Sequence, residues 1–313
     1  MTLLQIVTAN IGGHRHLNDT PLDTTQIARD VRGILPIDAA HPTLIALQET
    51  TEVWHGSNAS SDGETLARSL GADYRFLFAP EIDSDVHAHS KIWQRSMYRG
   101  YSRVRNGNGI VTNLPIAQWM WSLPPTGYPG AGGAPAIHTT IGRAKLYSSG
   151  SRDTQPRNLI VSCLQSPFGV LYFMTTHLST LRGEERRNPD HQYSQQASRE
   201  RQFEAGQILA LVSELRSAES DAGTDARPII LAGDFNAEAS APEIQMLQPI
   251  FTLMNPTPSP DGTHINHKIH IDHILISDPL NTLPAVQQVY VNTAPGVASV
   301  TDHRPVIAIL GNS

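Results

Sequence analysis

Cysteine is nearly absent from this chain, since a single residue, Cys163, occurs among 313. One thiol excludes an intramolecular disulfide, and its place in the apolar run Leu159–Leu164 predicts a buried core thiol rather than a nucleophile. Long apolar runs are also absent, so the sequence predicts no membrane-spanning segment. Because no leader-like segment precedes the first predicted strand, we expect a cytoplasmic protein, with a secreted form as the alternative if a leader has been removed.

Acidic residues are missing from one long stretch, which we call the acid-free span, from Val86 to Arg152. The whole chain carries a net charge of −6, so it makes no global case for a polyanionic partner, but the charge is strongly segregated. With 39% hydrophobic and 17% charged residues, a sizeable core is available, and the composition is not typical of a disordered chain. The basic residues of the span are Lys91, Arg95, Arg99, Arg103, Arg105, Arg143, Lys145 and Arg152.

Six short polar motifs adjoin apolar runs that are typical of buried strands. Strand ends are where rigid scaffolds present catalytic groups. Carboxylate and amide oxygens suit Mg²⁺ or Mn²⁺, and a histidine beside an aspartate suits general-base chemistry. The set therefore indicates metal-assisted attack of water on a phosphate ester. The motifs are Thr8–Asn10, Leu47–Thr50, Thr176–Ser179, Gly233–Asn236, Ile271–His273 and Thr301–His303.

In order and spacing these motifs resemble the endonuclease/exonuclease/phosphatase superfamily, which includes deoxyribonuclease I, apurinic endonucleases, deadenylases, neutral sphingomyelinases and inositol polyphosphate 5-phosphatases. The resemblance extends from Asn10 to His303. It implies an α/β (α+β) four-layer sandwich, in which two packed mixed β-sheets are flanked by helices. We expect a single domain over residues 1–313, because one site draws on motifs from both ends of the chain.

The resemblance also implies a set of metal ligands. In the family, the carboxylate that matches Glu49 is the main ligand, the amide that matches Asn10 supports it, and the aspartate that matches Asp302 contributes near the metal. Mg²⁺ (or Mn²⁺) is the implied cofactor, because it prefers one or two carboxylates together with water and substrate phosphate. In isolation Glu49 would be read as an ordinary carboxylate after a strand, but the constellation favours a ligand.

The catalytic residues follow from the same resemblance. His303 is the expected general base, and Asp272 is expected to orient its ring and to raise its pKa. Asp234 and Asn236 are expected to lie across the scissile phosphate. His177 could stabilise charge on the phosphoryl oxygens, as a cation or as a hydrogen-bond donor. The alternative for His177 is a buried histidine bonded to a backbone carbonyl.

Four further histidines lie in sequence near Asp272: His264, His267, His270 and His273. The pair His267 and His273 suggests zinc, but no third ligand at the spacing of a tetrahedral site accompanies it. We therefore interpret these four as surface or strand-face histidines.

Substrate class is the least determined property. Thr176–Leu178 resembles the sphingomyelinase, deadenylase, 5-phosphatase and deoxyribonuclease I branches, whereas the 5-phosphatase signature before Asp272 is absent. Asn108 matches an asparagine of the family's Gly-Asn-x-Ile strand and is predicted to bind substrate, whereas Asn113 stands where arginine is usual. Arg103 and Arg105 are predicted substrate contacts, because cations and aromatics alternate in Lys91–Arg105 as on nucleic-acid surfaces. An equally weighted alternative is a solvated loop whose arginines pair with acids elsewhere.

We therefore rank a nuclease acting on DNA or RNA first and a lipid or small-molecule phosphodiesterase or phosphatase second. A catalytically silent binding domain ranks last, because every motif position is chemically competent. The expected partner is a phosphate-ester substrate, possibly a nucleic acid, and we expect a monomer. Helices are predicted over Asp23–Leu35, from Ser61 to Leu70 and over Ser198–Arg216. Strands are predicted over residues 3–7, 44–48, 74–78, 108–112, 139–146, 159–164, 170–176, 229–232, 271–276, 286–291 and 306–310.

Overall fold

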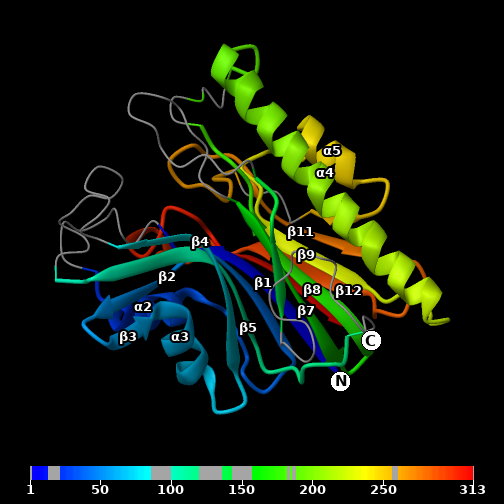
Figure 1. Ribbon diagram of the computed structural model, residues 1–313, viewed down its shortest axis with the longest axis horizontal. Helices are drawn as coiled ribbons and strands as arrows, with labels where there is room; N and C mark the ends of the chain where they lie inside the picture. The colour runs from blue at the N-terminus through cyan, green and yellow to red at the C-terminus, as the bar shows by residue number, and fades with distance from the viewer. Residues whose placement is uncertain are drawn as a thin grey trace.

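Two β-sheets pack face to face in the computed structural model, with helices on both outer faces (Figure 1). The structure describes residues 2–12, 22–85, 100–119, 136–142, 157–181, 184, 188–255 and 260–312. One sheet runs in the order β12-β13-β1-β2-β5-β4 with β3 beside β2, and the other in the order β10-β11-β9-β8-β7-β6. The elements are β1 Leu3–Asn10, α2 Thr24–Ile34, β2 Thr43–His55, β3 Asn58–Ser61, α3 Asp62–Leu70, β4 Arg75–Asp85, β5 Arg103–Thr112, β6 Ile137–Thr140, β7 Asn158–Ser166, β8 Gly169–His177, α4 Gln192–Asp221, β9 Ile229–Asp234, α5 Pro242–Leu247, β10 Thr252–Met254, β11 Asp272–Ser277, β12 Val286–Val291, the short helix η1 Val297–Ser299 and β13 Val306–Gly311.

The period of two along each central strand produces three stacked apolar layers. In β1, Leu4 and Ile6 face the other sheet, whereas Val7 faces the helices α2 and α3. In β9, Ile230 faces the first sheet, and Leu231 packs towards α4 and α5. The predicted four-layer sandwich of two mixed sheets is therefore confirmed.

Each sheet contains a β-α-β crossover that joins two adjacent parallel strands. Helix α2 connects β1 to β2, and helix α4 connects β8 to β9. Parallel strands end at the same edge of a sheet, so both crossovers deliver their carboxyl ends to one edge of the sandwich. The antiparallel neighbours β11 and β13 begin at that edge, because Asp272 pairs with Asp234 and Val306 pairs with Thr8.

The predicted helix starts agree with the structure where a capping side chain is present. Asp23 accepts hydrogen bonds from the first backbone N–H groups of α2, and the Ser61 hydroxyl accepts one from Glu64 at the start of α3. Gly71 ends α3 with a φ of 155°. Cys163 is buried as predicted, and burial raises the pKa of its thiol to about 11.

Several elements are longer than predicted, and four were not predicted. Strand β2 continues past Glu49 to His55, β4 continues to Asp85, β5 begins at Arg103, and α4 extends beyond both predicted ends. The short elements β3, β10, α5 and η1 were missed. Residues outside the described ranges include Lys91, Arg95 and Arg99 of the acid-free span and residues 143–146 of one predicted strand. Among the described residues, no helix is both long and apolar enough to cross a membrane.

Candidate active site

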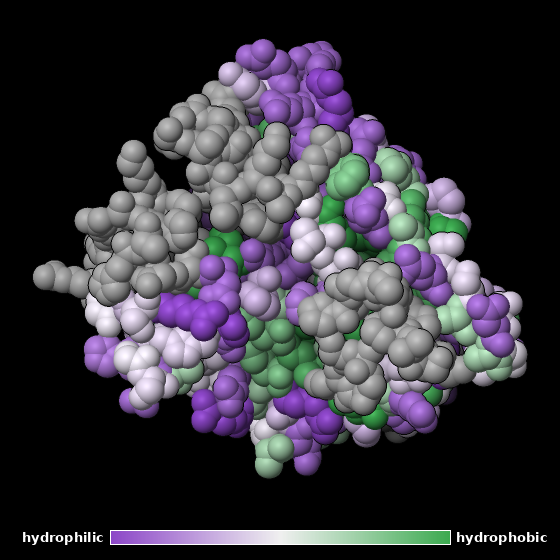
Figure 2. Space-filling model, in the orientation of Figure 1, coloured by the Kyte–Doolittle hydropathy of each residue, from purple (hydrophilic) through white to green (hydrophobic). Residues whose placement is uncertain are grey.

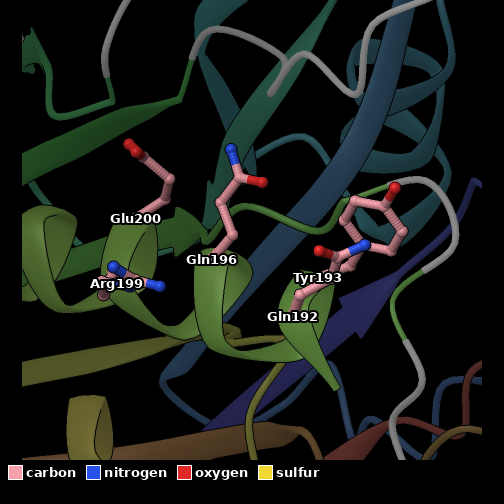
Figure 3. A pocket seen from close by; sticks show the side chains of 5 residues that line it. All are labelled: Gln192, Tyr193, Gln196, Arg199 and Glu200. Atoms are coloured by element: carbon pink, nitrogen blue, oxygen red, sulfur yellow. The ribbon is translucent and has the colours of Figure 1, made fainter. Parts of the chain in front are cut away.

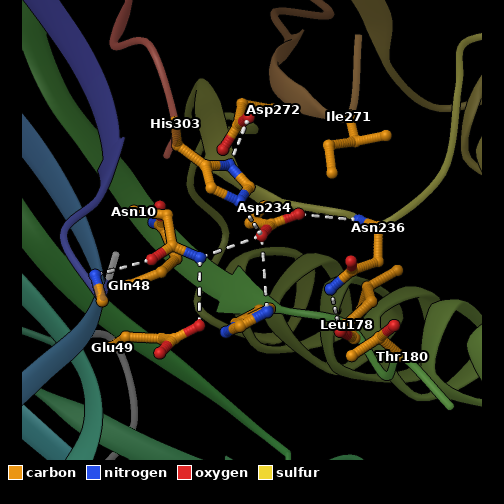
Figure 4. A network of polar contacts seen from close by, with 12 residues as sticks. Asn10, Gln48, Glu49, Leu178, Thr180, Asp234, Asn236, Ile271, Asp272 and His303 are labelled. Carbon is orange, nitrogen blue, oxygen red and sulfur yellow. Dashed lines mark hydrogen bonds and ion pairs between the residues drawn. The ribbon is translucent and has the colours of Figure 1, made fainter. Parts of the chain in front are cut away.

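The predicted catalytic and metal-ligating residues meet at the edge where the two crossovers end (Figure 4). Asn10 is the last residue of β1, and Glu49 lies beside it in β2. His177 and Asp234 are the last residues of β8 and β9 and are directly paired in register. The network in Figure 4 also includes Asp272, Asn236 and His303.

Glu49 occupies a β-bulge, which redirects its side chain. The register of β2 with β5 shifts between Leu47 and Thr50, and Glu49 has a φ of 58°. This left-handed conformation is unfavourable for a residue with a Cβ and is typical of functional positions. The bulge is stabilised by the Nδ2 of Asn106, which donates to the carbonyl oxygen of Glu49 at 3.0 Å. Glu49 Oε1 thereby accepts from Asn10 Nδ2 at 3.3 Å.

Asp234 is the centre of the polar network. Its Oδ2 accepts from Asn10 Nδ2 at 3.0 Å and lies 3.4 Å from His177 Nε2 and 3.8 Å from His303 Nε2. Its Oδ1 accepts from the backbone N–H of Asn236 at 2.8 Å, in a local turn that leaves Asn236 with a φ of 50°. Asn10 therefore bridges Glu49 and Asp234 across the two sheets.

His303 and Asp272 form a buried dyad. Nδ1 of His303 lies 2.9 Å from Asp272 Oδ2, an arrangement that fixes the ring and leaves Nε2 facing Asp234. Two threonine hydroxyls hold the flanking backbone: Thr301 Oγ1 accepts from the N–H of His303, and Thr263 Oγ1 accepts from that of Asp272. Burial opposes protonation of His303, but the negative charges of Asp272 and Asp234 outweigh it and raise its pKa to about 10.

His177 has the opposite electrostatic environment. Burial, aided by the charge of Arg157, lowers its pKa to about 4, so the imidazole is neutral at pH 7. Of the two modes predicted for His177, this environment favours a neutral hydrogen-bond donor. Its Nδ1 is buried and has no hydrogen-bond partner among the described residues.

A second buried network, missed from the sequence, lies beside His177. Arg157 Nη1 forms an ion pair with Glu81 at 3.1 Å, and both side chains are 2% exposed. Glu81 Oε1 also accepts from the Asn108 amide at 3.0 Å and from the N–H of Asn158 at 3.1 Å. This network joins β4 and β5 of one sheet to β7 of the other. The signal that could have found it is the one used for the motifs, a charged residue at the end of an apolar run.

Asn108, a predicted substrate contact, is fully buried in this second network. Its Nδ2 donates to Asn158 Oδ1 at 2.8 Å as well as to Glu81, while its Oδ1 has no partner among the described residues. The substrate role of Asn108 stays a prediction.

Arg103 and Arg105, the other predicted substrate contacts, lie on the extension of β5 and pair with acids of neighbouring strands. Arg103 Nε donates to Asp83 Oδ1 at 2.6 Å, and Arg105 Nε donates to Asp83 Oδ2 at 3.0 Å. Both guanidinium groups also lie over the Trp54 ring, 5.2 and 5.3 Å from its centroid. In this arrangement a single carboxylate partly neutralises both cations.

The donor set at this edge fits a hard divalent cation. Carboxylate and amide oxygens come from Glu49, Asp234 and Asn10, and Asp272 Oδ1 is buried with no hydrogen-bond partner in the described part of the chain. Two groups place their ligand atoms within 4.8 Å of one another: Asp234, Asp272 and His303, and also His264, Asp302 and His303. Asp302 therefore joins the site on the His303 side.

The histidines near Asp272 differ in environment. His273 is buried, and its Nε2 lies 2.8 Å from the carbonyl oxygen of Ala237, as a structural histidine does. His264 is also buried, and its ring lies 4.7 Å from that of His303. Of the two alternatives for His264, surface or strand face, its burial and its β-bridge to His303 favour the strand face.

A cavity of about 850 Å³ adjoins the site at Asn236 and Ile271 and continues between α4 and α5. Buried Arg201 lines it, paired with Glu184 at 3.0 Å and with Glu243 at 2.5 Å. A smaller cavity of about 480 Å³ lies over the first turns of α4 (Figure 3). Its lining is Gln192, Tyr193, Gln196, Arg199 and Glu200, on the hydrophilic end of α4 seen in Figure 2, and it includes none of the predicted site residues.

The two mixed β-sheets with helices on their outer faces are those of a deoxyribonuclease I-like α/β sandwich, and the carboxylate, amide and histidine cluster lies at one edge of it. The model of the Endonuclease/Exonuclease/phosphatase family matches residues 7–303. The chain belongs to this family, whose members act on phosphoester bonds and generally use divalent metals.

Solved structures share the fold at low sequence identity. The human Nocturnin catalytic domain with bound sulfate anion is 15% identical with a TM-score of 0.59, over 99% of this chain and 95% of that one. An endonuclease/exonuclease/phosphatase from Beutenbergia cavernae DSM 12333 is 18% identical with a TM-score of 0.57, over 100% and 72%. Humanized D. rerio TDP2 is 15% identical with a TM-score of 0.52, over 100% of both chains. A comparison with curated proteins found no sequence match.

Proposed function

We propose that this chain is a Mg²⁺- or Mn²⁺-dependent phosphodiesterase. The observation that carries the proposal is the Asp272–His303 dyad, with Nδ1 and Oδ2 2.9 Å apart and Nε2 directed towards Asp234. A base with this geometry can take a proton from water positioned for in-line attack on phosphorus. Family membership supports phosphoester chemistry in general, and the dyad supports hydrolysis in particular.

The residues around the dyad have complementary roles in this proposal. Asp272 holds the His303 ring and stabilises the imidazolium that forms on proton transfer. Asn236 and neutral His177 donate hydrogen bonds to phosphoryl oxygens as negative charge develops on them. Glu49 and Asn10, with Asp302 and Asp234 nearby, would hold the divalent cation. That cation would act as a Lewis acid towards the phosphoryl and leaving oxygens.

The proposed substrate of first rank is DNA or RNA. Arg103, Trp54 and Arg105 support it, because they stack cations on an aromatic ring at the exposed end of β2 and β5. A lipid or small-molecule phosphodiester is the second candidate. The observation that favours it is the pairing of both arginines with Asp83, which reduces the positive charge available to a polyanion.

Metal dependence is the first prediction and tests the reaction class. Hydrolysis of a chromogenic phosphodiester should stop in excess chelator and return when Mg²⁺ or Mn²⁺ is added in excess over it. Glu49→Gln should require more metal for half-maximal activity, since it replaces the proposed main ligand. Full activity in excess chelator would contradict the proposal. In a separate measurement, metal-dependent rates on single-stranded DNA, RNA and sphingomyelin would rank the substrate classes.

A further inference from the structure

We propose that the cavity between α4 and α5 is a substrate subsite, which takes an uncharged, hydroxyl-bearing organic group of the phosphodiester rather than a second phosphate. A nucleoside at the end of a nucleic acid and a small polyol ester share this chemistry. The inference rests on the proposed function in one respect, because the phosphodiester must bind at the candidate active site. The preference for an uncharged group rests on the lining of the cavity.

The cavity begins at residues that adjoin the polar network of the active site. Asn236 and Ile271 line it, and both are drawn around Asp234 in Figure 4. The two carboxylate oxygens of Asp234 have different partners: Oδ2 accepts from the proposed metal ligand Asn10, whereas Oδ1 accepts from the backbone N–H of Asn236. A phosphate bound at Asp234 would therefore have the metal ligands on one side and the cavity on the other. One of its two ester groups would then extend into the cavity.

The size and the lining of the cavity suit a small organic group. Its volume of about 850 Å³ lies within the range of about 300–1,000 Å³ that is typical of ligand pockets. Part of the lining is apolar and comes from Ala237, Ile269 and Ile271, and α4 contributes the hydroxyl of Ser198 and the amide of Gln202. A largely uncharged lining with a few polar groups is what orients an uncharged ligand.

The buried arginine of the cavity is already bound to carboxylates. Nη1 and Nη2 of Arg201 donate to the two carboxylate oxygens of Glu184 at 3.1 and 3.0 Å, and Nε donates to Glu243 Oε1 at 2.5 Å. Nη1 also donates to the carbonyl oxygen of Ser179 at 3.2 Å. Arginine recognises phosphate through a similar pair of parallel hydrogen bonds. Because Glu184 occupies this pair, Arg201 is not available to bind a phosphate in the cavity.

The remaining charges of the lining would repel a second phosphate. Asp190 and Glu238 are exposed, and neither forms an ion pair within the described ranges. Like charges at short range disfavour binding, whereas an uncharged group is not repelled. Four carboxylates and two guanidinium groups line the cavity in the described part of the chain: Glu184, Asp190, Glu238 and Glu243, and Arg199 and Arg201.

Calorimetry with unhydrolysable diester analogues in Mg²⁺ tests this preference without turnover. The probes are phosphinate analogues of a dinucleoside monophosphate, in which CH₂ replaces both ester oxygens, either unmodified or with one phosphate added at the 5′ or the 3′ end. We expect the added phosphate at one of the two ends to weaken binding at least about fivefold at low salt. Asp190→Asn combined with Glu238→Gln should reduce that loss to about twofold or less, because it removes the excess negative charge.

The matched control makes the same change of net charge outside the cavity. Glu214→Gln combined with Asp221→Asn alters two exposed positions of α4 that do not line the cavity, and it should keep the full loss. An analogue in which glycerol replaces one nucleoside distinguishes the two sources of the bound group. Tighter binding of the dinucleoside form would indicate the end of a nucleic acid, and tighter binding of the glycerol form would indicate a small polyol ester.

The outcomes separate the subsite from the proposed function. Equal binding of the unmodified and phosphorylated analogues by the parent chain, or no binding at all, would overturn the inference. The same loss in the cavity variant and in the control would also overturn it. Metal-dependent hydrolysis of the corresponding diesters is measured separately. The expected binding preference in a chain without such hydrolysis would leave the cavity as a binding site and reject the proposed function.

Discussion

His303 shows how the environment of a single residue sets its chemistry. The charges of Asp272 and Asp234 give it a pKa of about 10, at which the ring is protonated at neutral pH and cannot accept a proton. A divalent cation held by the neighbouring carboxylates would offset that negative charge and lower the pKa towards the range of a working base. His177, only 3.4 Å from the same Asp234, is held neutral by burial and by Arg157. The pKa values of two histidines beside one carboxylate are thus shifted in opposite directions.

The second prediction concerns this dyad. His303→Ala should lower kcat by about two orders of magnitude or more, the usual contribution of a general base, with an unchanged fold by circular dichroism. Asp272→Asn should change kcat in the same direction, because it removes the carboxylate that orients the ring. His41→Asn serves as the control for removal of an imidazole elsewhere. Near-native kcat in His303→Ala would move the role of base to another residue, with His177 next in line.

At the scale of the elements, the sequence predicted most strands and the helices with capping residues, because these signals are local. Glu49 was expected after the end of a strand but lies inside β2, since the continuation to His55 depends on pairing with β3 and β5. The Glu81–Arg157 pair was missed because its partners are 76 residues apart and meet only through sheet packing. The site motifs themselves were predictable, because each adjoins a strand whose apolar pattern is strong.

The third prediction tests the contact between β8 and β9. A Cβ on Gly233 would lie 2.1 Å from the carbonyl oxygen of Thr176, so only glycine allows the two backbones to place His177 beside Asp234. Gly233→Ala should destabilise the fold by about 1–3 kcal/mol, as overpacking does, and should lower kcat because Asp234 is displaced. Urea denaturation and initial rates measure the two effects.

Gly206→Ala is the matched control for that substitution. Gly206 lies within α4, and a Cβ there would meet nothing within 4 Å. Helix propensity predicts that this variant is more stable by about 0.5–1 kcal/mol. Equal stability and equal kcat for Gly233→Ala and the parent chain would show that the close approach of β8 and β9 is not required.

At the scale of the whole molecule, the distribution of charge separates the two substrate candidates. The chain is acidic overall, yet the acid-free span is rich in lysine and arginine. Two of these cations, Arg103 and Arg105, lie on β5, outside the edge of the sandwich that carries the candidate active site. In the described structure these two cations face Asp83 of β4 and Glu52 of β2, at 3.6 Å or less. A nucleic acid would have to compete with these carboxylates for the two arginines. A small diester would contact only the candidate active site.

The fourth prediction exploits that competition. If Arg103 and Arg105 contact nucleic-acid phosphates, the double substitution by Ala should weaken binding of single-stranded oligonucleotides and reduce the log–log salt slope by roughly one unit for each lost contact. Asp83→Asn should do the opposite and strengthen binding, because it removes the acid that pairs with both arginines. The rate of hydrolysis of a small chromogenic diester shows whether the candidate active site is intact in each variant. Oligonucleotide affinity and salt slope that are the same in the parent, the double variant and Asp83→Asn would identify these arginines as surface ion pairs, and a lipid or small-molecule phosphodiester would then become the favoured substrate.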